Sequence, residues 1–141
     1  MGYLVDTNVL SELRKGTHAD TLVQQWQSGR RSSDLWLSVL TLMEIKNGIK
    51  QVRRKDSLFA DKLDRWYAEH LLSEFSGRIL EVNLPICELR ASFPFERTLP
   101  NLDALIAATA KYHGLTIVTR NTKDFEGLGI ELLNPWEAAS E

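Results

Sequence analysis

The sequence predicts an α/β domain with a mainly parallel central sheet. Short apolar runs that contain β-branched residues alternate with longer segments whose apolar residues recur every three or four positions. Strands that alternate with helices form parallel sheets, because each helix carries the chain back to the start of the next strand. No linker, repeat or low-complexity segment interrupts the 141 residues, so we expect one domain over residues 1–141.

Each element is expected from its local pattern. The apolar runs predict strands at residues 3–5, 36–38, 79–82, 115–118 and 130–133. The three-four spacing predicts helices at residues 9–14, 22–26, 40–52, 58–72, 84–93 and 102–113. The segments 40–52 and 58–72 follow each other closely and should form a helical hairpin.

Residues that stop or start helices mark the boundaries. Asp6, Thr7 and Asn8 are helix-capping residue types and come directly after the first strand. Gly16 and Gly77 close the helices before them, and Pro94 ends the segment 84–93. Gly114 is a good residue to follow the last helix.

Composition excludes several classes of protein. The formal net charge is -2, with 17 Lys and Arg against 19 Asp and Glu, which argues against nonspecific coating of nucleic acid but not against a local basic patch. Cys87 is the one cysteine, so no internal disulfide can form. No apolar run approaches the roughly 20 residues that span a bilayer, and the first strand leaves no room for a signal peptide. We therefore expect a cytoplasmic protein.

Acidic residues lie at points where a parallel sheet binds ligands. Asp6 follows the first strand, and ligands bind beyond the carboxyl ends of parallel strands. Glu44 lies at the margin of an apolar helix stripe, Asp103 in the first turn of a helix, and Asp124 in a loop. Each of them also has an ordinary structural explanation. Asp6 could cap a helix and Glu44 could be a solvated acid on a helix surface. Asp103 could stabilise a helix N-terminus, and Asp124 could stabilise a turn.

Four segments taken together indicate a function more specifically than any single acidic residue does. They read LVDTNVL at 4–10, LMEI at 42–45, DALIAATA at 103–110 and TRNTKDF at 119–125. In this order and spacing they resemble the PIN-domain ribonuclease family, and within it the VapC-like toxins of type II toxin–antitoxin pairs. The segment Asn134-Pro135-Trp136 resembles the closing motif of the similar FitB proteins. The resemblance covers nearly the whole chain.

The resemblance implies a three-layer α/β/α domain whose acidic residues meet at the strand ends and hold Mg²⁺ or Mn²⁺. Asp6, Glu44 and Asp103 match the three core acids of the family, and Asp6 and Asp103 are the expected metal ligands. Many relatives place an aspartate where Asn121 stands, whereas relatives with a Thr-Arg-Asn sequence often keep an acid where Asp124 stands. We favour Asp124 as the fourth acid, with Asn121 as a neutral ligand or orienting residue.

Thr119 resembles the family's hydroxyl residue that hydrogen-bonds the first aspartate. Elementary electrostatics agrees with a metal site, because clustered carboxylates stay ionised mainly where a divalent cation neutralises them. Mg²⁺ prefers oxygen ligands, and no histidine lies at zinc-ligand spacing from another histidine or cysteine. The predicted activity is metal-assisted hydrolysis of RNA phosphodiester bonds.

Cationic residues near the acid-bearing segments are candidates for contact with RNA phosphates. They are Arg14, Lys15, Lys46, Arg120 and Lys123. The resemblance also implies a homodimer that a small antitoxin protein neutralises. Independently, the segment 40–72 has more large apolar residues than one core face requires, including Phe59, Trp66 and Tyr67, so part of it should form an interface.

Two other functions are consistent with part of the pattern. Asn121 in place of an acid keeps open a PIN-like scaffold that binds antitoxin or RNA without cleaving it. A receiver-like domain that is phosphorylated on Asp6 is discounted, because the second acid at the first strand end and the lysine after a later strand are missing. Gly-rich phosphate loops and nucleophile–histidine pairs are also missing from the sequence.

Overall fold

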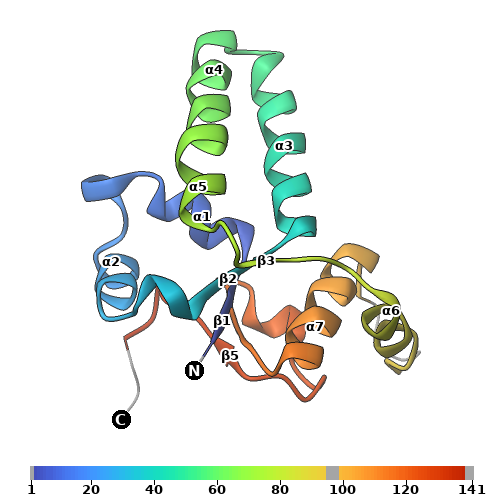
Figure 1. Cartoon of the computed structure of the whole chain (residues 1–141). Coiled ribbons are helices and arrows are strands. Elements are labelled where there is room, and N and C mark those ends of the chain that lie inside the picture. The colour runs from blue at the N-terminus through green and yellow to red at the C-terminus, as the bar shows by residue number, and fades with distance from the viewer. Residues whose placement is uncertain (1, 95–98, 139–141) are drawn as a thin grey trace.

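Five short strands form a parallel sheet in the order β3-β2-β1-β4-β5 (Figure 1). The computed structural model describes residues 2–94 and 99–138. The strands are β1 (Tyr3–Val5), β2 (Leu35–Ser38), β3 (Ile79–Leu80), β4 (Thr116–Val118) and β5 (Leu132–Leu133). Because β1 lies between β2 and β4, the strand order reverses at β1, and the crevice beyond the ends of β1 and β4 is the expected ligand site.

Helices connect the strands and cover both faces of the sheet (Figure 1). They are α1 (Thr7–Leu13), α2 (Thr21–Ser28), α3 (Val39–Arg53), α4 (Ser57–Arg65), α5 (Leu72–Glu74), α6 (Leu84–Ala91) and α7 (Asn101–His113). Shorter turns are the 3₁₀-helices η1 (Gly16–His18), η2 (Ser32–Asp34) and η4 (Thr122–Phe125), and the π-helix η3 (Trp66–Leu71). None of the helices in the described ranges is long and apolar enough to cross a membrane.

Alternate strand residues enter two separate cores, as the two-residue period of a strand requires. On one face Val5 and Val118 join a cluster with α1, α2 and α3. On the other face Leu4 and Ile117 join a cluster with α7, through residues such as Ile106. Two cores on opposite faces make three layers, so the predicted α/β/α fold is confirmed.

The predicted helical hairpin is formed by α3 with α4, and it projects away from the sheet (Figure 1). Arg53 on α3 binds Asp61 and Asp64 on α4 at 2.9 and 2.6 Å, which joins the end of α3 to the second half of α4. The second arm is less regular than predicted. The expected helix at 58–72 is divided by the π-helix η3, which contains Trp66 and Tyr67.

The helix α1 begins two residues earlier than its predicted start at residue 9. Asp6 caps it, with the carboxylate Oδ1 accepting a hydrogen bond from the Thr7 amide at 2.9 Å. Thr7 and Asn8 therefore belong to the first helical turn instead of a loop. This earlier start fixes their side chains beside the ends of β1 and β4.

Candidate functional site

Asp6 lies at the centre of the candidate site, directly after β1. Its amide donates to the carbonyl of Val118 at 3.0 Å, which continues the pairing of β1 with β4 by one residue. Its side chain is buried, with 9% of the residue exposed. The carboxylate therefore has a fixed position at the carboxyl edge of the sheet.

Thr119 follows β4 and faces Asp6 across the two strand ends. It is fully buried, and its hydroxyl donates to Asp6 Oδ2 at 2.8 Å. The same hydroxyl oxygen accepts from the Asn121 amide at 3.1 Å and from Asn8 Nδ2 at 3.3 Å. Two approaching donors occupy its lone pairs, so its single hydrogen is directed to the carboxylate of Asp6.

Glu44 reaches the site from the first half of α3. The Thr7 hydroxyl donates to Glu44 Oε1 at 2.8 Å, which joins α3 to the first turn of α1. Burial raises the pKa of the Glu44 carboxyl, the Thr7 hydrogen bond opposes this rise, and the charges of Asp6 and Asp103 raise the pKa further. Glu44 therefore lies within electrostatic reach of both aspartates.

Asp103 enters from the opposite layer, in the first turn of α7. Burial raises the pKa of its carboxyl, and the charges of Asp6 and Asp124 add to the rise. Asp124 belongs to η4, and its amide donates to the carbonyl of Asn121 at 3.1 Å. The four acids predicted from the sequence, at the end of β1 and on α3, α7 and η4, are thus linked to one another by their charges.

The donor set suits a hard divalent cation. All four acids offer oxygen, and the pKa values of Glu44 and Asp103 are raised, mainly by burial and further by the charges of neighbouring carboxylates. In the described part of the chain, no three acidic, histidine or cysteine side chains are close enough to hold a metal by themselves. Mg²⁺ is compatible with this spacing, because it keeps several water ligands and needs only one or two carboxylates.

Sequence reasoning missed the roles of Thr7 and Asn8, which it treated as helix caps. Thr7 holds Glu44, and Asn8 contacts both Thr119 and the backbone amide of Arg120, whose N–H donates to Asn8 Oδ1 at 3.1 Å. The position of Asp6 in the sequence could have indicated these roles. An aspartate that caps a helix places the next two residues in the first turn, beside the strand end.

The five candidate phosphate-binding residues lie in different environments. Arg120 follows Thr119, and its guanidinium lies over the Trp136 ring at 4.8 Å from the ring centre. Lys123 lies in η4 beside Asp124. Both are therefore on the loop that follows β4, at the carboxyl edge of the sheet.

The other three candidates lie outside the loop that follows β4. Lys46 pairs with Asp64 at 3.1 Å and lies 4.9 Å from the centre of the Tyr67 ring, so it faces the second arm of the hairpin. Lys15 pairs with Glu12 at 3.0 Å. Arg14 lies over the Phe59 ring at 5.4 Å.

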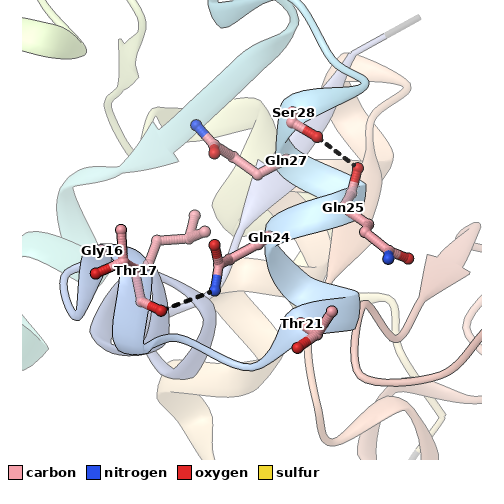
Figure 2. Close-up of a pocket in the computed structure, with 8 residues that line it drawn as sticks. Gly16, Thr17, Thr21, Gln24, Gln25, Gln27 and Ser28 are labelled. Carbon is pink, nitrogen blue, oxygen red and sulfur yellow. Dashed lines mark hydrogen bonds between the residues drawn. The ribbon is translucent and has the colours of Figure 1, made fainter.

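A groove of about 500 Å³ between η1 and α2 is distinct from the acidic site (Figure 2). It is lined by uncharged groups, among them Thr17, Gln24 and Gln27. The Gln24 amide donates to the carbonyls of Thr17 and Ala19 at 3.4 and 2.6 Å, so it ties α2 to η1. No acidic residue lines this groove, so it is not where the carboxylates converge.

Comparison with known proteins identifies the family to which the chain belongs. The family description "PIN domain" matches residues 3–130. The chain belongs to the PIN domain family. The resemblance found in the sequence is therefore confirmed.

Relatives of this PIN domain include toxins and ribonucleases. The "VapC ribonuclease Y4jK" of Sinorhizobium fredii is 31% identical, over 96% of this chain and 99% of that protein. A crystal structure of FitAcB from Neisseria gonorrhoeae superposes with a TM-score of 0.87 at 30% identity, covering 96% of this chain and 99% of the other. A toxin–antitoxin complex from Klebsiella pneumoniae gives a TM-score of 0.70 at 30% identity, covering 97% of this chain and 100% of the other.

Proposed function

We propose that this PIN domain is a metal-dependent endoribonuclease and the toxin of a toxin–antitoxin pair. The convergence of Asp6, Glu44, Asp103 and Asp124 at the carboxyl edge of a parallel sheet carries the proposal. Burial and neighbouring charges raise the pKa values of Glu44 and Asp103, and a bound divalent cation would favour their ionised forms. Phosphodiester hydrolysis is the chemistry that such a cation promotes. The similarity to a protein named a VapC ribonuclease supports RNA as the substrate.

The four acids have different proposed roles. Asp6 and Asp103 would hold Mg²⁺ or Mn²⁺ directly, Asp6 from the end of the central strand β1 and Asp103 from the first turn of α7. The ion supplies polarisation of the scissile phosphate and activation of water. Glu44 and Asp124 complete the negative site, and Asn121 orients Thr119 through its backbone amide. Glu44, held by the Thr7 hydroxyl, would accept a proton from a water molecule.

The protein framework keeps these groups in place. The Thr7 amide and the Thr119 hydroxyl each donate to one oxygen of Asp6, so the carboxylate cannot rotate freely. The Thr7 hydroxyl does the same for Glu44. Arg120 and Lys123 would bind backbone phosphates of RNA on the same edge, which places the substrate against the acids.

An antitoxin and a second copy of the chain are the proposed protein partners. The similarity to a toxin–antitoxin complex supports the first. Exposed apolar side chains on the hairpin support an interface of either kind, with Leu58 76% exposed, Met43 48% and Phe59 37%. Light scattering of the purified chain tests the homodimer, and co-purification with the product of an adjacent short reading frame tests the antitoxin. Cytoplasm is the compartment that an RNA substrate implies.

Cleavage of RNA by the purified protein tests the activity. We expect cleavage with Mg²⁺ or Mn²⁺, none with EDTA, and none by Asp6→Asn, which keeps the shape of the side chain. Gln51→Ala, an exposed change on α3, serves as the matched control and should cleave like wild type. Equal activity of Asp6→Asn and wild type would refute the site. If the wild type binds RNA but does not cleave it with or without metal, the chain is instead a PIN-like scaffold that binds without cleaving.

A further inference from the structure

Asn8 lies between the acidic site and the loop that carries Arg120. Its Nδ2 donates to the Thr119 hydroxyl oxygen at 3.3 Å and lies 3.5 Å from Asp6 Oδ2. Its Oδ1 accepts from the backbone amide of Arg120 at 3.1 Å. One side-chain amide thus contacts the residues that follow both strands at the switch point, Asp6 and Thr119, which are 113 positions apart in the sequence.

Only one orientation of this amide satisfies its neighbours. The Arg120 N–H can only donate, so it requires the amide oxygen. The Asp6 carboxylate can only accept while it is ionised, so it requires the amide N–H₂. Because Asn8 donates to the hydroxyl oxygen of Thr119, the hydroxyl hydrogen remains directed to Asp6.

The Arg120 backbone is held at both of its polar groups. Its N–H is bound by Asn8, and its carbonyl accepts from Asn134 Nδ2 at 3.4 Å. Asn134 Oδ1 in turn accepts from the Trp136 amide at 2.9 Å, and the Trp136 ring supports the Arg120 guanidinium. The position of this cation therefore depends on Asn8 from one side and on the Asn134–Trp136 segment from the other.

We propose that Asn8 is a positioning residue with two separate tasks in RNA cleavage. Its amide N–H₂ keeps the Thr119 hydrogen on Asp6 and so orients the acid. Its amide oxygen holds the Arg120 backbone and so places a phosphate-binding cation beside the acids. This inference rests on the proposed ribonuclease function.

Two substitutions separate the tasks. Asn8→Asp keeps an oxygen for the Arg120 amide, loses the donor toward Thr119 and adds a negative charge beside Asp6, whereas Asn8→Ala loses both contacts and adds no charge. Partners that orient a metal-binding group change activity or metal affinity by about 10- to 100-fold when they are removed. We expect kcat to fall at least about tenfold in both variants. A second effect, a rise of KM for RNA, is expected in Asn8→Ala alone.

Hydrogen exchange of the metal-free protein supplies a readout that does not depend on activity. The Arg120 amide should be protected in wild type and in Asn8→Asp, and should exchange faster in Asn8→Ala. The double variant Asn8→Ala/Arg120→Ala should have the KM of Arg120→Ala alone, because the oxygen of Asn8 acts on KM through Arg120. Gln51→Ala should match wild type in all three measurements.

The outcomes are distinct. Wild-type kcat in Asn8→Asp, or unchanged exchange of the Arg120 amide in Asn8→Ala, would overturn the role of Asn8 while leaving the ribonuclease proposal intact. A wild-type protein that cleaves no RNA with either metal would overturn both. Asn8→Asp is the variant that tests the donor even if Asn8→Ala does not fold, because an acid in the first turn of α1 favours the helix.

Discussion

The Thr119 hydroxyl donates to Asp6 Oδ2 at 2.8 Å and joins residues that are 113 positions apart in the chain. The contact exists because β1 and β4 are paired in register, Val5 beside Val118, so that the next residue of each strand reaches the same edge. A buried hydroxyl here does more than fill space. It satisfies a carboxylate oxygen and accepts two hydrogen bonds from the loop and helix around it.

Thr119→Val should impair both stability and activity. Valine has the shape of threonine but leaves the buried Asp6 carboxylate without its donor and the Asn8 amide and Asn121 N–H without their acceptor. A buried unsatisfied polar group such as this carboxylate oxygen costs about 1–3 kcal/mol. We expect the free energy of unfolding to fall by that amount and kcat to fall about 10- to 100-fold. Urea denaturation and RNA cleavage measure the two effects.

Thr119→Ser is the control, because serine keeps the hydroxyl. It should restore most of the activity, while any loss of stability that it shows comes from the missing methyl group. A serine variant as inactive as the valine variant would mean that the hydrogen bond is not what the site needs.

Glu44→Gln should stabilise the metal-free protein at neutral pH. The pKa of Glu44 is raised in the folded protein above its ordinary value of 4.5, mainly by burial. The folded state therefore binds the proton more tightly than the unfolded chain, and above the folded pKa the ionised carboxylate lowers stability. As the pH falls through the folded pKa toward 4.5, this penalty disappears. The advantage of the glutamine variant over wild type should disappear over the same interval.

Urea denaturation in EDTA, compared at pH 7.5 and at pH 4.5, measures this difference. Addition of Mg²⁺ at pH 7.5 should reverse the order, because a ligand that binds only the folded state stabilises it and wild type binds the ion better. Wild type more stable than Glu44→Gln in EDTA at pH 7.5 would contradict the assignment of Glu44 to a repulsive cluster.

Some of this site could be predicted from local sequence, and some could not. Asp6 was recognisable because a short apolar strand ends directly before it, and the carboxyl edge of a parallel sheet is where ligands bind. No predicted strand ends directly before Glu44 or Asp103. They lie on separate helices, and only the strand order brings those helices to opposite sides of Asp6. The family resemblance supplied what periodicity could not.

The hairpin shows a different limit. Apolar spacing predicted one continuous helix over residues 58–72, yet the π-helix η3 interrupts it at Trp66–Leu71. Over one turn, the patterns of α- and π-helices share most of their apolar positions, so side-chain spacing does not distinguish them. The error in the predicted start of α1 was smaller than the error in the hairpin. The correct start follows once Asp6 is recognised as the cap of this helix.

Asp124→Ala should reduce cleavage more than Asn121→Ala. Asp124 lies close enough to Asp103 to raise the pKa of its carboxyl, so its charge acts within the cluster. Asn121 supports Thr119 through its backbone amide, which alanine keeps. We expect a loss of at least about tenfold in kcat for Asp124→Ala and a smaller loss for Asn121→Ala. The reverse order would assign the fourth position to Asn121.

Arg120→Ala should weaken RNA binding more than Lys46→Ala. Arg120 lies on the loop after β4 and is supported by the Trp136 ring, whereas Lys46 is paired with Asp64 and turned toward Tyr67. Each phosphate contact that is lost lowers the slope of log affinity against log salt concentration by about one. The slope should therefore fall by about one for Arg120→Ala and remain near wild type for Lys46→Ala.

Fluorescence anisotropy of labelled RNA, titrated in EDTA at several salt concentrations, measures these slopes without cleavage. Lys50→Ala, an exposed change in the last turn of α3, removes the same charge away from the acids and controls for net charge. Lys46→Ala also removes a partly exposed ion pair, which contributes about 0–1 kcal/mol, so its main effect should be on the stability of the hairpin. If Lys46→Ala lowers the salt slope as much as Arg120→Ala does, the RNA must cross the hairpin as well as the loop after β4, and Lys46 must leave Asp64 when RNA binds.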